Sequence, residues 1–305
     1  IHPWAWGILA LVAIGLVVID FLGHARNPHP PTAAEAGRWT LFYVGLAALF
    51  GVGIWLTNGW LYAQEFYAGW AMEWSLSVDN LFVFILILKA FRVPRENQQK
   101  ALLLGIVIAL LLRLAFILLG AALVSRFSWV FFIFGAWLLW TAVSQVRETA
   151  RGEEEDEEYH ENGFIRLVRH VLPITDGFVG NRLLYRHGGH TYLTPLAVVV
   201  LALGSADLMF AFDSIPAIFG ITQQAFLVFA CNVFALMGLR QLFFLVDALL
   251  SKLVYLGYGL GVILSFIGVK LILEALHANT LPFINSGRGV EWAPNISVSV
   301  SLGVI

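Results

Sequence analysis

The chain has 305 residues, a mean hydropathy of +0.81 and only 12% charged residues, whereas a soluble domain carries about 25%. This composition excludes an ordinary soluble domain and predicts a polytopic membrane protein. The formal net charge of −2 gives no indication of nucleic-acid binding. The single cysteine, Cys231, lies in an apolar segment, which excludes a disulfide framework and a thiolate metal cluster.

Apolar stretches of about 20 residues mark the expected membrane spans in chain order. We place eight of them at residues 4–22, 40–62, 66–90, 101–123, 127–146, 194–219, 225–248 and 255–276. A ninth begins near residue 293 and is cut off at Ile305, and the chain begins at Ile1 rather than Met, so we expect it to be trimmed at both ends. The sequence therefore predicts an all-α, polytopic transmembrane helix bundle that forms a single domain over residues 1–305.

The lysines and arginines between the spans predict the orientation, because positively charged loops stay in the cytoplasm. With the N-terminus outside, the outer loops hold only Arg126 and Arg288. The inner loops then hold a much larger group: Arg26, Arg38, Lys89, Arg92, Arg95, Lys100, Arg147, Arg151, Arg166, Arg169, Arg182, Arg186 and Lys252. We therefore expect the N-terminus outside and the long loop, residues 147–192, in the cytoplasm.

That long loop contains an acidic run from Glu153 to Glu158, followed by His160 and Glu161. One interpretation is a solvated, mostly disordered turn. The other is a weak cation-gathering patch on the cytoplasmic side. Further along the loop, residues 163–171 are amphipathic, which predicts a short interfacial helix.

Two of the spans contain carboxylates at bilayer depth, where each costs on the order of 3 kcal/mol unless it is compensated. Both spans repeat one pattern of an acid, five intervening residues, a second acid and a small polar residue: Glu73, Asp79 and Asn80, then Asp207, Asp213 and Ser214. Packing alone does not require such a repeated spacing. We therefore organise the functional interpretation around these two motifs.

Helix geometry predicts how the motif residues are arranged. Residues six positions apart lie about 9 Å apart along the axis and about 120° apart around it. Glu73, Ser77 and Asn80 therefore share one face of the third span, with the second acid on the flank. In the sixth span, Pro216 should kink or break the helix and free carbonyl groups beside Asp213.

The motif-bearing third and sixth spans must run in opposite directions across the membrane. The span that follows each of them carries one arginine, Arg113 in the fourth and Arg240 in the seventh. Spans 2–4 and 5–7 thus look like two three-helix repeats with inverted topology. Such repeats are typical of transporters, which place the ion site near the bilayer midplane at the repeat interface.

The side chains offered by the two motifs are carboxylates, an amide and hydroxyls. All-oxygen sites suit hard divalent cations such as Mg²⁺, Ca²⁺ and Mn²⁺. Four carboxylates exceed the charge of one such cation, so Arg113 and Arg240 can neutralise part of the excess, or one acid stays protonated and permits proton coupling. The structural alternative is that the acids pair with the two arginines only to hold the bundle together. Near the end of the eighth span, Lys270 and Glu274 predict a local ion pair at i and i+4.

The segments at residues 73–80 (EWSLSVDN) and 210–217 (FAFDSIPA) resemble the TerC family of integral membrane proteins, which is named for tellurium resistance and includes the Alx proteins. The resemblance covers most of the chain, from about the second span to the eighth. It implies a LysE-like superfamily bundle in a bacterial inner (plasma) membrane and export of Mn²⁺ from the cytoplasm. It also implies metal binding by the motif residues Glu73, Asp79, Asn80, Asp207, Asp213 and Ser214.

Members of that family are also linked to tellurite resistance, to metal loading of exported enzymes and to thylakoid membrane biogenesis. The leading hypothesis is a secondary transporter that exports Mn²⁺, with Ser77, Arg113, Arg240 and Pro216 in supporting roles. No ATP-binding motif is present, so an ion or proton gradient or the membrane potential would drive it. We expect no prosthetic group and no nucleic-acid partner, and a homo-oligomer is compatible with the sequence.

Two other classes of function compete with export. A non-transport membrane partner could help other proteins to acquire metal or to assemble. An intramembrane protease could use Asp79 and Asp213, but neither lies in a Gly-x-Gly-Asp motif, and Glu73 and Asp207 would then have no role. We therefore expect that the protein is not an enzyme.

Overall fold

The computed structural model describes residues 3–25, 32–151, 163–175, 177–187, 190–246, 256–279, 281–282, 284–290 and 292–305. Eight helices in this part of the chain are long and apolar enough to cross a membrane. They are α1 Trp4–Ala25, α2 Ala33–Asn58, α3 Trp60–Ala90, α4 Arg95–Arg126, α5 Val130–Arg151, α7 Pro195–Phe219, α8 Ala225–Val246 and α9 Leu256–His277. The predicted all-α membrane bundle and its eight spans are confirmed.

Several helices extend beyond the predicted spans at their polar ends. α3 begins at Trp60 rather than at residue 66, and α4 begins at Arg95 rather than at residue 101. The apolar stretch predicts only the part of a helix within the bilayer, whereas its ends depend on capping. Thr32 caps α2 by accepting a hydrogen bond from the backbone N–H of Glu35. Gly59 separates α2 from α3 with a φ of +98°, a conformation that favours glycine.

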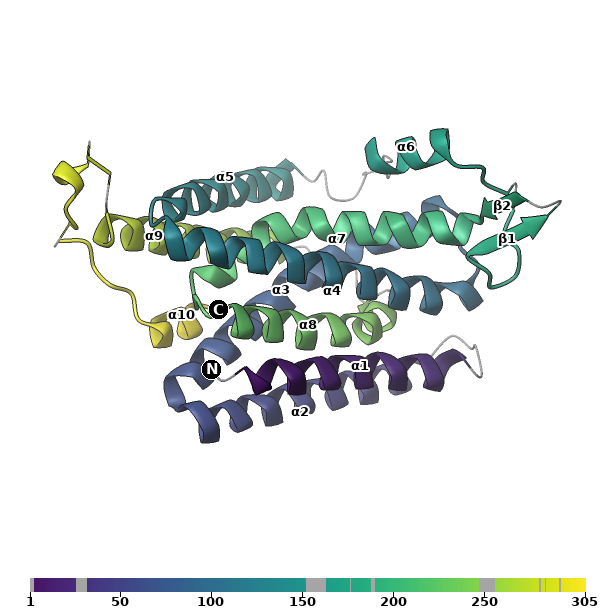
Figure 1. Ribbon diagram of the computed structural model, residues 1–305, viewed down its shortest axis with the longest axis horizontal. Coiled ribbons are helices and arrows are strands. Elements are labelled where there is room, and N and C mark those ends of the chain that lie inside the picture. Colours follow the sequence, from purple (N-terminus) through teal and green to yellow (C-terminus); the bar gives the residue numbers. More distant parts are fainter. Residues whose placement is uncertain are drawn as a thin grey trace.

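Four helices form the centre of the bundle. α3 packs along α8, α4 packs along α7, and α3 also contacts α7. α1 and α2 lie on one side of this group, while α5 and α9 lie on the other and pack closely on each other (Figure 1). In an inverted repeat of spans 2–4 and 5–7, α3 corresponds to α7 and α4 corresponds to α8. The α3–α8 pair is then equivalent to the α7–α4 pair, as such a repeat requires. The outer helices break the symmetry, because α2 packs on α8 whereas α5 packs on α9.

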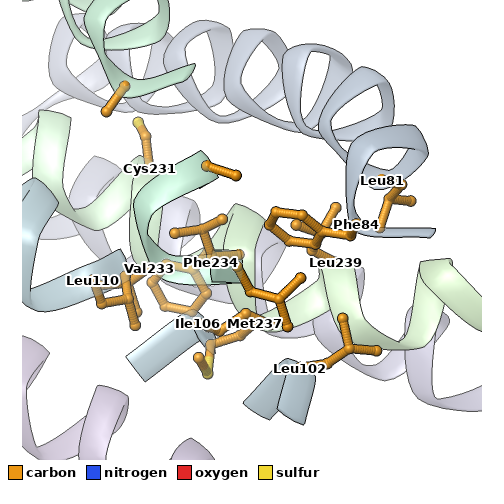
Figure 2. Packing of buried hydrophobic residues seen from close by; sticks show 14 of the residues in the cluster. Leu81, Phe84, Leu102, Ile106, Leu110, Cys231, Val233, Phe234, Met237 and Leu239 are labelled. Atoms are coloured by element: carbon orange, nitrogen blue, oxygen red, sulfur yellow. The ribbon is translucent and has the colours of Figure 1, made fainter. Parts of the chain in front are cut away.

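The centre is filled with apolar side chains that come from all four of these helices. Leu81 and Phe84 of α3, Ile106 and Leu110 of α4, and residues of α8 belong to one buried cluster (Figure 2). Elsewhere, small residues allow two helices to approach each other closely, as is common in membrane proteins. At Gly135 of α5 an added Cβ would lie 2.8 Å from the carbonyl oxygen of Gly268 in α9.

The segments between the spans contain shorter elements. The predicted amphipathic helix is present as α6 Gly163–Val171, but the same loop also forms an antiparallel hairpin, β1 Leu184–His187 and β2 His190–Leu193, which we did not predict. The acidic run at 153–158, with His160 and Glu161, lies outside the described residues. After α9 come a short 3-10 helix, Asn285–Gly287, and α10, Val298–Val304. α10 has 7 residues and packs against α3 where the ninth span was expected.

Candidate functional site

A cluster of buried polar side chains lies where α3, α4, α7 and α8 meet. We call it the Arg113 centre, and it consists of Glu73, Arg113, Asp207, Ser214 and Asn232. Ser214 is 1% exposed and the other four side chains are 0% exposed. Charged groups at such depth must be paired or hydrogen-bonded, so their contacts define what the cluster can do.

The guanidinium of Arg113 joins the cluster together. Its Nε donates to Asp207 Oδ2 at 2.6 Å and its Nη2 donates to Asp207 Oδ1 at 3.1 Å, which makes this pair bidentate. Its Nη1 donates to Glu73 Oε1, to Asn232 Oδ1 at 2.6 Å and to Ser214 Oγ at 3.2 Å. One side chain of α4 thereby bonds to three other helices.

Local helix geometry explains how these partners converge. Asp207 and Ser214 are two turns apart on α7 and so present the same face. The Asn232 side chain is fixed because its Nδ2 donates to the Val228 carbonyl, one turn earlier on α8, at 2.8 Å. That leaves Asn232 Oδ1 free to accept from Arg113. The acceptors around Arg113 Nη1 are thus carboxylate, amide and hydroxyl oxygens held by three rigid helices.

The charges of the Arg113 centre do not cancel. Glu73 and Asp207 carry two formal negative charges against the single positive charge of Arg113. Glu73 Oε2 is buried and has no hydrogen-bond partner within the described residues. Burying such an acceptor without a hydrogen bond costs about 1–3 kcal/mol, and more for a charged group. The centre therefore retains an oxygen and a negative charge that a further cation can satisfy.

The second acid of the α7 motif lies apart from the Arg113 centre. Asp213 accepts a hydrogen bond from Trp137 Nε1 at 2.6 Å and from Thr141 Oγ1 at 3.1 Å, both on α5. Asp213 precedes Ser214 by one residue, so it points about 100° away around the helix. We predicted that Asp213 would share one site with Asp207, and its observed bonds go to α5 instead.

Two predicted site residues cannot be placed in this arrangement. The backbone of Asp79 belongs to α3 and that of Arg240 belongs to α8, but both side chains lie outside the described residues. Among the side chains that are described, no three His, Cys, Asp or Glu residues come together as a ready metal site. Metal binding by the motif residues therefore stays a prediction.

The remaining predicted residues lie on either side of the Arg113 centre. Ser77 and Asn80 are 0% and 4% exposed and share the α3 face of Glu73. Of the kink or break predicted at Pro216, the break is wrong because α7 continues to Phe219, and the kink stays a prediction. Pro216 is in the last turn, where its missing N–H removes only one helical bond, and its own carbonyl accepts from Gly220 N at 3.1 Å.

Sequence reasoning missed Asn232, although an asparagine within an apolar span was a usable signal. It also missed a second polar cluster, which we call the Lys270 cluster: Glu65, Thr222, Gln223, Lys270, Glu274 and Ser301. Thr222 Oγ1 donates to Glu65 Oε2 at 2.6 Å, and Gln223 Nε2 donates to Glu274 Oε1 at 2.7 Å. Lys270 Nζ donates to Ser301 Oγ at 2.9 Å, and its charge interacts with that of Glu274 without a direct hydrogen bond between the two.

Comparison with known proteins now identifies the family. Residues 58–305 match the model of the integral membrane protein TerC family, and this range includes every residue of the Arg113 centre. The chain belongs to the TerC family.

Similar proteins cover almost the whole chain. An "Uncharacterized membrane protein" of Mycobacterium tuberculosis (strain CDC 1551 / Oshkosh) is 45% identical over 300 residues, which is 98% of this chain and 75% of the relative. Another of Myxococcus xanthus is 35% identical over 99% of this chain and 90% of the relative. The "Putative membrane-bound redox modulator Alx" of Escherichia coli (strain K12) is 34% identical over 99% of this chain and 91% of the relative. No solved structure matches the chain.

Proposed function

We propose that this TerC-family protein is a secondary transporter that exports Mn²⁺, or a similar hard divalent cation, from the cytoplasm. The observation that supports this most is the convergence of oxygen ligands on Arg113 Nη1. Glu73, Ser214 and Asn232 reach that one point from α3, α7 and α8. Carboxylate, hydroxyl and amide oxygens are the ligands that Mn²⁺, Mg²⁺ and Ca²⁺ prefer.

Charge balance supports a divalent substrate. Within the Arg113 centre, two carboxylates against one arginine leave one negative charge, and a divalent cation would be balanced by that charge together with one further motif acid. In this structure Arg113 is the internal cation of the site. Cation binding to Glu73, Ser214 and Asn232 would require the Arg113 guanidinium to move away from these oxygens, because Nη1 is fixed relative to Nε and Nη2. Arg113 would then prevent two carboxylates from facing each other uncompensated when the site releases its cation.

The arrangement of the helices supports alternating access. α3–α8 and α7–α4 form equivalent pairs, and rocking of one inverted repeat against the other exposes a midplane site to each side in turn. We propose that the N-terminus is outside, that residues 147–192 lie in the cytoplasm and that the membrane is a bacterial inner membrane. We also propose that transport uses an ion gradient or the membrane potential, with no enzymatic step and no prosthetic group.

The alternative is a non-transport membrane partner in metal loading, tellurium resistance or membrane-protein assembly. The bidentate bond between Arg113 and Asp207 fits it as well as it fits transport, because a purely structural ion cluster would have the same geometry. A redox role, as in the name of the Escherichia coli relative, receives no support from the thiol of this chain. Cys231 is the single cysteine, and its buried Sγ donates to the Phe66 carbonyl at 3.3 Å.

Flux into proteoliposomes tests the proposal. Purified protein is reconstituted and the uptake of Mn²⁺, Ca²⁺, Mg²⁺ and Zn²⁺ is compared with that of empty liposomes. We expect Mn²⁺ to be transported, and Asp207→Asn to abolish its transport because the site loses one negative charge. Asp213→Asn is expected to do the same from its position against α5. Glu148→Gln, an acid-to-amide change at the exposed end of α5, is the matched control and should leave the flux unchanged.

Normal Mn²⁺ flux in both aspartate variants would mean that these acids are structural. It would favour the non-transport alternative, provided that the amounts of reconstituted protein are equal.

A further inference from the structure

The Arg113 centre and the Lys270 cluster are connected by the contact between α3 and α7, which run in opposite directions. Glu73 of α3 and Ser214 of α7 both bond to Arg113 Nη1. Eight residues before Glu73 and eight residues after Ser214, Glu65 Oε2 accepts a hydrogen bond from Thr222 Oγ1 at 2.6 Å. The two pairs therefore share one register, and they lie about 12 Å apart along the helices. The Lys270 cluster thus continues the line of contact toward the start of α3.

Midway along this line the helices are in tight apolar contact. Gly69 lies one turn from each acid of α3, and a Cβ added there would be 3.4 Å from Ile218 Cγ2 of α7. The same Cβ would be 2.8 Å from Cys231 Sγ of α8, which belongs to the buried apolar cluster (Figure 2). The charges of Glu65 and Glu73 both act on the Cys231 thiol, as expected for a group between the two acids. A polar cluster therefore lies on each side of a narrow apolar closure.

The Lys270 cluster covers the end of the line with contacts from several parts of the chain. Lys270 of α9 is only 6% exposed, and its Nζ donates to Ser301 Oγ of α10 at 2.9 Å. Its charge interacts with those of Glu65 and Glu274, without a direct hydrogen bond to either among the described side chains. Glu274 accepts instead from Gln223 Nε2 at 2.7 Å. The buried ammonium thus lies close to two carboxylates and can move between them without breaking an ion pair.

We propose that the Lys270 cluster is the outer gate of the export path and that Lys270 is its charged element. The path leads from the Arg113 centre along the contact of α3 and α7, past Gly69, to Glu65. When the gate is closed, the ammonium lies across the outer end of this path and repels cations there. When it opens, Lys270 moves toward Glu274 and leaves the Glu65 carboxylate to the departing divalent cation. The inference rests on the proposed function and orientation, and its gate residues lie in neither acid motif.

Cys231 reports whether the gate is open, because it is the single cysteine of the chain and lies beside Gly69. The full chain is placed in membrane vesicles, and a membrane-impermeant cationic thiol reagent is added to either face. We expect the wild type to be labelled slowly. Lys270→Gln should be labelled about tenfold faster from the outer face, because the charge that repels the reagent is gone. Lys89→Gln, at the exposed far end of α3, is the matched control and should behave like the wild type.

A second variant tests the gate without changing its charge. Thr222→Val deletes the hydrogen bond to Glu65, so it should also be labelled faster from the outer face, by a smaller factor than Lys270→Gln. It decides the question if Lys270→Gln does not fold. Cys231→Ala gives the background of the reagent. Mn²⁺ flux is measured in the same vesicles and should fall in Lys270→Gln, because a gate that cannot close prevents alternating access.

The side of labelling separates a gate from a general loosening of the bundle. Unchanged labelling in both gate variants, or a rise that is equal from both faces or confined to the inner face, would overturn the inference. The Lys270 cluster would then be a packing element, while export itself would stand. Faster outer labelling with unchanged Mn²⁺ flux would also overturn it, since the opened route would not be the export path. Wild-type protein that moves no Mn²⁺ would overturn the proposed function and this inference with it.

Discussion

The Arg113 centre and the Lys270 cluster contain the same charges in different arrangements. Each places two carboxylates and one basic side chain inside membrane-spanning helices. In the Arg113 centre the charged groups bond directly to each other, with Asp207 held by two N–H groups of one guanidinium. In the Lys270 cluster each charged group has a neutral partner, because Lys270 bonds to Ser301 and Glu274 bonds to Gln223.

Depth in the bundle accounts for the difference. Arg113 and its acids are completely buried, whereas Glu65 and Glu274 of the Lys270 cluster are only half-buried and lie near helix ends. Full burial requires the direct pairing and the planar fork that arginine provides. Lys270 is itself only 6% exposed, but its acidic neighbours are half-buried, so hydroxyl and amide partners are sufficient there. Among the described side chains, direct ion pairs thus occur at the Arg113 centre, the site proposed for the substrate.

The largest effect is expected from breaking the Arg113 centre. Arg113→Ala leaves Glu73 and Asp207 buried and unpaired, and removing one partner of a buried pair typically costs about 3–5 kcal/mol. We expect a markedly lower thermal unfolding temperature in detergent and little protein in the membrane. Arg126→Ala, at the end of the same helix, is the control and should behave like the wild type. Equal unfolding temperatures for both variants would contradict the assigned role of Arg113.

A smaller and more selective effect is expected when one acid of each cluster becomes an amide. Asp207→Asn retains the size of the side chain but weakens the bidentate pair, and we expect a loss of about 2–3 kcal/mol in stability. Glu65→Gln can still accept from Thr222 at the half-buried position, so the expected cost is below about 1 kcal/mol. Unfolding curves of both variants measure the difference. A larger loss for Glu65→Gln would mean that depth does not distinguish the two clusters.

The sequence predicted the parts of the structure that local patterns determine. The eight spans follow from apolar length, and the shared face of Asp207 and Ser214 follows from helical periodicity. The cost of a carboxylate in lipid was sufficient to single out Glu73 and Asp207, which the structure brings together around Arg113. The sequence could not show that these two acids share one arginine, because that depends on how α3, α4 and α7 pack.

The features that sequence reasoning missed depend on contacts between distant segments. Asp213 is directed to α5 by Trp137 and Thr141, and no local pattern showed that α5 would lie beside α7. Asn232 was a single polar residue in an apolar span, which we passed over because it is uncharged. The hairpin after α6 was missed because we interpreted the loop from its acidic run. Pro216 was interpreted as a break although it lies within one turn of the helix end.

The smallest effect is expected where a neutral partner of Lys270 is removed. Ser301→Ala deletes the hydroxyl of α10 that accepts from Lys270 Nζ at 2.9 Å. Because the charges of Glu65 and Glu274 still compensate that of the buried Lys270, we expect a loss of only about 1 kcal/mol, the net contribution of one hydrogen bond. Ser299→Ala is the control on the same short helix, since its exposed bond to Gln64 should be worth less than about 0.5 kcal/mol. Ser301→Ala could instead destabilise the protein as strongly as Arg113→Ala. Lys270 would then need its bond to Ser301 as much as the carboxylates of the Arg113 centre need their bonds to Arg113. The contrast between an interior that needs direct ion pairs and an end that does not would then be wrong.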